Sequence, residues 1–276
     1  MTDVRTAPTQ TLAEDHGQPT GGFIWYELMT SDPEGSKAFY DALVGWEIGD
    51  AAPEFNGYRM IGRSDGGYAG GVLPLTAEMQ QHGARPSWLG YLHVSDVDES
   101  ARRIEQDGGK TLMAPFDIPK VGRVAMVADP QGAPFYIMTP TPPAGDPNAQ
   151  SDVFSPSAEQ RVGWNELQTS DVPAARRFYG EQFGWGTDEY MDMGPMGEYR
   201  FIEQGGQRIG ALFDVSDGRP PHFRFYIRVP SIEKAKGIAE AKGGTIHMGP
   251  HQVPTGDYIV IGSDPQGAEF SLVGGA

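Results

Sequence analysis

The sequence contains no cysteine among its 276 residues. Disulfide bridges, thiolate metal sites and cysteine-based catalysis are therefore excluded. Long hydrophobic runs are also lacking, so no segment is typical of a membrane-spanning helix. Residues 1–21 are polar and have neither the basic start nor the apolar stretch of a secretory signal. They predict a disordered N-terminal tail, and we expect a cytoplasmic protein.

Positive charge is scarce, since 21 Lys and Arg residues stand against 37 Asp and Glu residues and give a formal net charge of −16. An acidic surface repels phosphate backbones and anionic lipids. We therefore expect neither a nucleic-acid partner nor a membrane partner. Glycine (38 residues) and proline (23) are abundant, which is typical of many tight turns between short strands.

The chain contains an internal repeat. Residues 25–46 (WYELMTSDPEGSKAFYDALVGW) align without a gap on residues 164–185 (WNELQTSDVPAARRFYGEQFGW), and 10 of the 22 positions are identical. Chance would give roughly one or two identities. The motif DPQGA also occurs once in each half, at 129–133 and 264–268. Because the order of the motifs is the same in both halves, one duplication explains them all.

The repeat divides the chain into two predicted domains. The first covers residues 22–140 and the second covers residues 161–276. Residues 141–160 are rich in Pro, Ser and Asp and predict a linker.

Each half is itself double. Residues 25–29 alternate as in a strand, and Asp32 followed by Pro33 predicts the start of a helix that ends at Gly45. Short strands follow near 46–50, 57–62 and 68–73, and the pattern begins again at residue 88. The predicted unit is β-α-β-β-β, used four times, in an α+β fold.

Each half combines four motifs: a strand followed by Ser-Asp, a helix containing Phe-Tyr, a Gly-Trp corner and a closing Asp-Pro-x-Gly. In this combination the chain resembles the vicinal oxygen chelate superfamily, which includes glyoxalase I, bleomycin-resistance proteins and extradiol dioxygenases. The motifs W-x-E-L-x-T-x-D and M-x-P-x-x-x-P are similar to a two-domain subgroup labelled glyoxalase-like or hydroxylase. The resemblance implies two open, U-shaped, eight-stranded mixed sheets, each with a hollow that holds a divalent metal.

The resemblance also implies where metal ligands would lie, seven residues before each helix cap and seven residues after the Asp of each Asp-Pro-x-Gly. None of these positions holds His, Glu or Gln, the ligand types of the superfamily. We therefore expect no cofactor, with a divalent metal bound by non-standard ligands such as His222 or His247 as the alternative. The six positions hold Trp25, Leu89, Tyr136, Trp164, Arg224 and Ser271.

Strand alternation predicts which repeated residues line each hollow, because the face that carries Leu28 should pack on the helix. A carboxylate on the other face needs a partner, and a Tyr-Arg pair on a nearby strand recurs in both copies. Two interpretations stay open: a Glu general base beside an anion-binding Arg, or a Glu–Arg pair that holds two strands together. The repeated residues are Trp25, Glu27, Tyr58 and Arg59 in the first copy, and Trp164, Glu166, Tyr199 and Arg200 in the second.

Other positions differ between the copies and are the better guide to function. The first hollow is predicted to be aromatic, with one titratable His93, and the second to be cationic and suited to a carboxylate or phosphate. The alternatives are a solvent-facing His93 and arginines whose stems cover the sheet. The corresponding sets are Leu89, Tyr91, His93, Leu112 and Tyr136 in the first copy, and Arg224, Tyr226, Arg228, His247 and Ser271 in the second.

Three functions follow as hypotheses. The first is binding of a small organic metabolite, with metal-free lyase, isomerase or hydroxylase-type chemistry by Glu27, His93 or Glu166. The second is a metal-dependent lyase or dioxygenase, and the third is a protein that sequesters a drug or antibiotic. A monomer or a homodimer is expected.

Overall fold

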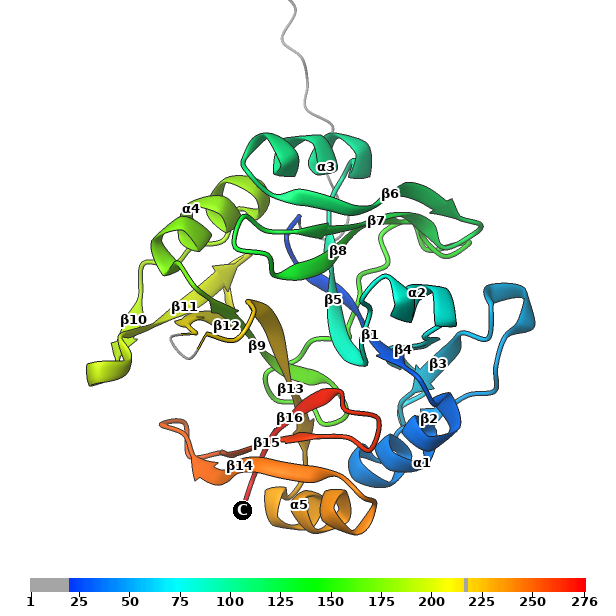
Figure 1. Cartoon of the computed structure of the whole chain (residues 1–276), viewed down its shortest axis with the longest axis vertical. Coiled ribbons are helices and arrows are strands. Elements are labelled where there is room, and N and C mark those ends of the chain that lie inside the picture. Colours follow the sequence, from blue (N-terminus) through cyan, green and yellow to red (C-terminus); the bar gives the residue numbers. More distant parts are fainter. Residues whose placement is uncertain (1–19, 216–217) are drawn as a thin grey trace, which may run out of the picture.

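The computed structural model describes residues 20–215 and 218–276 and contains two eight-stranded mixed sheets (Figure 1). Most of the tail expected over residues 1–21 therefore lies outside the described residues. Residues 23–140 supply the first sheet and residues 162–274 supply the second. The expected fold class, with four β-α-β-β-β modules in a tandem duplication, is confirmed.

The first sheet has the strand order β2-β3-β4-β1-β5-β8-β7-β6. Its two modules meet at β1 and β5, which pair antiparallel, while β4 runs parallel to β1 and β8 parallel to β5. The strands are β1 (Phe23–Thr30), β2 (Glu47–Ile48), β3 (Arg59–Gly62), β4 (Tyr68–Pro74), β5 (Ser87–His93), β6 (Lys110–Ile118), β7 (Gly122–Ala128) and β8 (Pro134–Pro140).

The second sheet repeats this arrangement in the order β10-β11-β12-β9-β13-β16-β15-β14. Its modules meet at β9 and β13, which are again antiparallel. The strands are β9 (Val162–Thr169), β10 (Tyr190–Asp192), β11 (Glu198–Gln204), β12 (Gln207–Asp214), β13 (His222–Val229), β14 (Thr245–Gln252), β15 (Tyr258–Ser263) and β16 (Glu269–Gly274).

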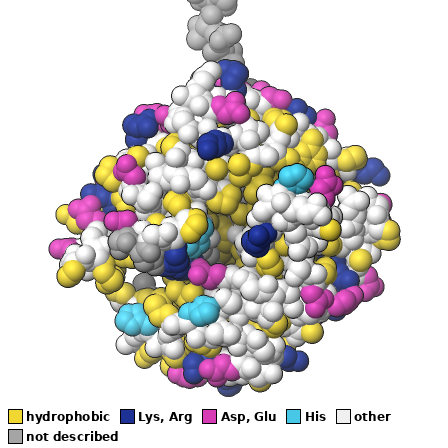
Figure 2. Space-filling model, in the orientation of Figure 1, with side chains coloured by type: hydrophobic (Ala, Val, Ile, Leu, Met, Phe, Trp, Pro, Cys, Tyr) yellow, Lys and Arg dark blue, Asp and Glu magenta, His cyan; other side chains and the backbone are white. Residues whose placement is uncertain are grey.

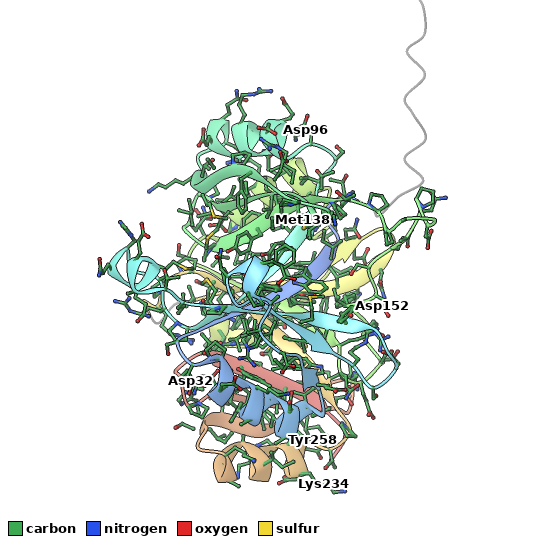
Figure 3. The ribbon with its side chains drawn as sticks, turned by 90° about the vertical axis from the view of Figure 1, so that its right-hand side faces the viewer. Asp32, Asp96, Met138, Asp152, Lys234 and Tyr258 are labelled. Atoms are coloured by element: carbon green, nitrogen blue, oxygen red, sulfur yellow. The ribbon has the colours of Figure 1, made fainter. Side chains whose placement is uncertain are left out.

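Each module has one long helix that begins at a side-chain cap. Asp32, Asp96, Asp171 and Ser231 each accept a hydrogen bond from the backbone N–H three residues further on, which satisfies one free donor of the first turn. Figure 3 labels Asp32 and Asp96 at two of these helix starts. The helices are α1 (Pro33–Val44), α3 (Val97–Gln106), α4 (Val172–Phe183) and α5 (Ile232–Ala241).

A further short helix, α2 (Ala77–Gln81), precedes β5. Strand and helix patterns of the sequence do not predict it, because five residues are too few to show an apolar period. Met79 of α2 and Ala84 pack on the apolar cluster of the first sheet's inner face. We use the term inner face for the side of each sheet opposite its long helices.

The helix-bearing faces of the two halves pack against each other and share one hydrophobic core. Phe23 and Tyr26 of β1 make ring contacts with Phe225 of β13 at centroid distances of 5.9 and 5.0 Å. The helices α1 and α5 lie side by side, as do α3 and α4 (Figure 1). The inner faces consequently point away from the shared core.

The repeated motifs meet across this boundary. Tyr40 of α1 donates a hydrogen bond to Asp264 of the second DPQGA turn at 3.0 Å. Tyr179 of α4 donates to Asp129 of the first DPQGA turn at 3.1 Å. The two Phe-Tyr helices and the two DPQGA turns therefore link one half to the other.

Residues 141–160 connect the halves and pack on both. Val153 is buried in the shared core, and Asp152 forms an ion pair with Arg63 at 2.5 Å. Trp46, at the end of α1, donates a hydrogen bond to the backbone carbonyl of Gln160. This segment thus has fixed contacts as well as a linker composition.

Candidate functional site

One buried carboxyl group lies on the inner face of the first sheet. Glu27 comes from the middle of β1 and is 3% exposed. The Tyr91 hydroxyl of β5 donates to its Oε2 at 2.8 Å. Its other oxygen, Oε1, has no hydrogen-bond partner among the described residues. We call Trp25, Glu27, Tyr58, Tyr91 and Tyr136 the first carboxyl site.

Aromatic side chains hold this carboxyl group in place. The rings of Tyr91 and Tyr136 stack with their centroids 4.3 Å apart. The Trp25 indole N–H donates to the Tyr58 hydroxyl at 2.8 Å, so the proton of that hydroxyl is free to point elsewhere. Strand pairing brings Glu27, Tyr91 and Tyr136 together, because β5 lies between β1 and β8.

Burial raises the pKa of Glu27 from 4.5 to about 7, and the neighbouring hydroxyl groups of Tyr91, Tyr58 and Tyr136 oppose this rise only in part. Within the described chain Glu27 forms no ion pair. Both the protonated and the ionised forms of the carboxyl group are therefore accessible near neutral pH, which suits a group that gives or takes a proton.

Methionine side chains make up much of the wall beside the first carboxyl site. Met29 and Met138 are buried there, and Met79, Met113 and Met126 are partly buried against the same cluster. Figure 3 labels Met138 on β8. Unbranched thioether side chains change conformation easily and fit ligands of varied shape. The methionine wall is thus a surface that could open around an apolar ligand.

The second half places the equivalent carboxyl group in a different setting. Glu166 accepts hydrogen bonds from Arg224 at 3.0 Å, from Gln168 at 2.6 Å and from Tyr199 at 2.7 Å. Arg224 also binds Glu269 at 2.7 Å. This group, the second carboxyl site, is a fully bonded ion-pair network.

A single pair of aligned positions explains most of this difference. Glu27 faces Leu89 across the β1–β5 ladder, and Glu166 faces Arg224 across the β9–β13 ladder. The leucine supplies no cation to the first carboxyl group, whereas the arginine neutralises the second. Positions 89 and 224 belong to the set that differs between the two copies, so this divergence changes the charge beside a buried carboxyl group.

The expected Glu–Arg pairing was wrong in its choice of arginine. Arg59 binds Glu34 at 2.6 Å, and Arg200 binds Glu198 at 2.5 Å. Neighbouring residues of a strand point to opposite faces, so Tyr58 faces the first carboxyl site while Arg59 does not. Tyr199 and Arg200 repeat this geometry. The alternation of the strand was the signal that could have prevented the error.

The remaining candidates are distributed more widely. His93 is 7% exposed, so the solvent-facing interpretation is wrong, and β5 places it two residues beyond Tyr91 on the same face. Arg228 binds Asp257 at 2.5 Å. His247 is exposed on the outermost strand β14 and shares a hydrogen bond with Ser263, so it does not join the second carboxyl site.

Other residues of the sites were missed. Gln168 shares a face with Glu166, two residues earlier, and strand alternation could have identified it. Tyr226, in contrast, was predicted and lies 3.4 Å from the Glu166 carboxylate. Glu269 and the methionine wall gave no recognisable sequence signal.

The positions at which the superfamily holds its metal do not fit a metal ion here. Trp25 donates its N–H to Tyr58, Leu89 is apolar, and Arg224 is a cation. The pKa of Tyr136 is raised well above its usual value, first by burial and then by the charge of Glu27, which disfavours a phenolate ligand. Across the described ranges, no group of three His, Cys, Asp or Glu side chains could hold a metal.

Residues 22–137 and 161–272 match the model of the Glyoxalase/Bleomycin resistance protein/Dioxygenase superfamily. The chain belongs to this superfamily, in a two-domain form. It is 28% identical over 251 residues to “Putative glyoxylase CFP32” of Mycobacterium tuberculosis, covering 90% of this chain and 93% of the relative. It is 29% identical over 268 residues to “Anthracycline biosynthesis protein DnrV” of Streptomyces peucetius, covering 92% and 93%.

Solved structures share the fold at lower identity. The Mn(II)-bound glyoxalase from Novosphingobium aromaticivorans superposes with a TM-score of 0.63 at 16% identity, covering 93% of this chain and 82% of that one. The 2,2',3-trihydroxybiphenyl 1,2-dioxygenase from Sphingomonas wittichii strain RW1 gives 0.63 at 16% identity, covering 93% and 91%. Separately, none of the helices within residues 20–215 and 218–276 is long and apolar enough to cross a membrane.

Proposed function

We propose that the protein binds a planar aromatic metabolite at the first carboxyl site and exchanges a proton with it through Glu27. The observation that carries this proposal is the buried Glu27 carboxyl group, which among residues 20–215 and 218–276 has no cation partner and one unbonded oxygen, and whose pKa is raised to about 7. A group of this kind can protonate a ligand oxygen or remove a proton from carbon.

The surroundings of Glu27 favour an aromatic ligand. Trp25 and the stacked Tyr91–Tyr136 pair offer flat apolar surfaces, and the methionine wall can adapt to a fused ring system. Two relatives from Streptomyces are named as anthracycline biosynthesis proteins, and anthracyclines contain fused aromatic rings. Those names support the ligand class, while the chemistry is inferred from Glu27.

The proton transfer uses only residues of the chain. Ionised Glu27 takes a proton from a carbon that is conjugated with a ligand carbonyl, and the electron pair of the broken C–H bond moves through the conjugated system to the carbonyl oxygen. The Tyr58 hydroxyl, whose oxygen already accepts from Trp25, is placed to donate to that oxygen. Return of the proton to the same carbon gives hydrogen exchange, and its return at another atom completes an isomerase-type reaction.

Deuterium uptake tests this proposal. Anthrone, a planar tricyclic ketone with an acidic CH2 group, would be incubated with the protein in D2O at pD 7, and uptake at that carbon followed by NMR. We expect catalysed exchange with the natural protein and a loss of about 100-fold or more in Glu27→Gln. Glu27→Gln preserves shape and removes a buried carboxyl group, so its circular dichroism should be unchanged.

The equivalent substitution in the other half shows which site acts. If Glu166→Gln abolished exchange and Glu27→Gln did not, the wrong carboxyl site would have been assigned. If neither the natural protein nor Glu27→Gln changed the exchange rate, although anthrone quenched tryptophan fluorescence, the site would bind without transferring a proton. That second result would favour sequestration over catalysis.

A further inference from the structure

A cavity of about 250 Å³ lies where the two halves meet, at the starts of β5 and β13. We call it the interdomain cleft. Figure 2 shows one face of the molecule, in the orientation of Figure 1. Near its middle lies a depression with hydrophobic side chains at its floor and charged and histidine side chains around it. Trp88 and Pro134 of the first half and Phe223 and Phe225 of the second supply its apolar lining.

The two copies differ at one residue of the cleft lining. Ser271 lines it, and Ser271 lies opposite Tyr226 as Tyr136 lies opposite Tyr91. In the first half the Tyr136 ring occupies the equivalent position and stacks on Tyr91. The serine has no ring and leaves this part of the lining small.

The polar groups of the cleft have unused bonding capacity. Ser271 is 1% exposed, and its hydroxyl has no hydrogen-bond partner in the described part of the chain. A buried hydroxyl without a partner is destabilising and is usually satisfied by a ligand or water. Arg224 also lines the cleft and uses three of its five N–H groups on Glu166 and Glu269. Both residues can therefore donate to an oxygen atom.

The charges indicate which kind of oxygen fits. Arg224 is already neutralised by two carboxylates, Glu166 and Glu269. A ligand carboxylate would add a third negative charge around the same guanidinium, which is unfavourable at these distances. A neutral hydroxyl or carbonyl oxygen can accept from Ser271 and Arg224 without that cost.

We propose that the interdomain cleft is a second binding site, separate from the first carboxyl site, for a neutral, flat ring compound of one or two rings that carries a hydroxyl or carbonyl oxygen. The ring lies between the aromatic side chains of the two halves, and the oxygen meets Ser271. The cavity volume, at the small end for ligand pockets, sets the limit of two rings.

The test uses 2-naphthol as a neutral probe and 2-naphthoate as its anionic counterpart, titrated into the full-length protein at pH 7. Binding would be measured by calorimetry and by quenching of tryptophan fluorescence, to which Trp88 contributes. We expect saturable binding of 2-naphthol and at least tenfold weaker binding of 2-naphthoate. No saturable binding of 2-naphthol, or tighter binding of 2-naphthoate, would overturn the proposal.

Two substitutions locate the probe. Ser271→Ala should weaken 2-naphthol binding about fivefold, because one hydrogen bond is lost. Ser271→Tyr restores the residue of the first copy and should abolish binding. The matched control is Ser263→Ala, which removes a serine of the neighbouring strand outside the cleft and should leave the affinity unchanged. Natural affinity in Ser271→Ala would show that the probe lies elsewhere.

Discussion

Glu27 is a residue whose ionisation should be visible in the stability of the whole protein. Its folded-state pKa is raised from 4.5 to about 7, so between these pH values the folded chain keeps a proton that the unfolded chain has lost. The free energy of unfolding must then fall as pH rises through this window and level off above pH 7. The total contribution is about 3 kcal/mol, from about 1.4 kcal/mol per pKa unit.

Glu27→Gln should remove this dependence. We expect the variant to gain about 3 kcal/mol of stability relative to the natural protein between pH 4.5 and 8, measured by urea denaturation at several pH values. Other titrating groups are common to both proteins and cancel in the difference. Stability curves that stay parallel across this range would mean that Glu27 has an ordinary pKa.

The aligned positions 89 and 224 allow the first carboxyl site to be converted into the second. Leu89→Arg combined with Tyr136→Ser places a guanidinium opposite Glu27 and makes room for it, as in the second half. We expect the pKa of Glu27 to fall well below 7 and proton exchange with anthrone to be lost. Carbon NMR of the labelled carboxyl group measures the pKa directly, and Leu89→Met is the control that keeps the position apolar.

At the scale of residues, the sequence predicted that Glu27, Tyr91 and Tyr136 line one hollow, because strand alternation and the repeat are local properties. It did not predict the partners of the arginines. Which cation reaches a buried carboxylate depends on the register of paired strands, and that register places Arg224 opposite Glu166. Register is a property of two distant segments, so a single segment cannot reveal it.

Among the elements, the DPQGA turns have two roles. Within each turn, Asp129 or Asp264 accepts hydrogen bonds from backbone N–H groups two and four residues further on, which shapes the turn. The other carboxylate oxygen accepts from a tyrosine of the opposite half. Sequence alone predicts the turn, whereas the tyrosine contact depends on how the halves pack.

Removing these tyrosine hydroxyls should weaken the contact between the halves. Tyr179→Phe leaves one oxygen of the buried Asp129 unbonded and should cost about 1–3 kcal/mol of unfolding free energy. Tyr40→Phe should cost at least as much, because its hydroxyl also accepts from the Trp88 indole. The two tyrosines lie in separate helix pairs, so the double variant should lose nearly the sum of the two single losses in unfolding free energy. Urea denaturation checks this, with the exposed Tyr68→Phe as the control.

For the whole molecule, the duplication predicted two domains of equal design but not that they would behave as one body. The apolar helix stripes and the sheet faces beneath them could have formed two separate cores. Instead, aromatic residues of the central strands pack across the boundary, with the Phe23 and Phe223 ring centroids 5.7 Å apart. No sequence pattern distinguishes a side chain buried within its own half from one buried against the other half.

A shared core predicts a single cooperative unfolding transition. Phe225 packs on Phe23 and Tyr26 of the other half, so Phe225→Ala leaves a cavity at the boundary and should cost about 3–5 kcal/mol. Its unfolding curve should shift as a whole, with circular dichroism and tryptophan fluorescence superimposing, because Trp46 and Trp185 lie in different halves of the same core. Two separate transitions, of which the substitution moves only one, would show that each half folds around a core of its own. Coincident curves would mean that the two halves unfold as one unit, so that a ligand bound between them would stabilise both together.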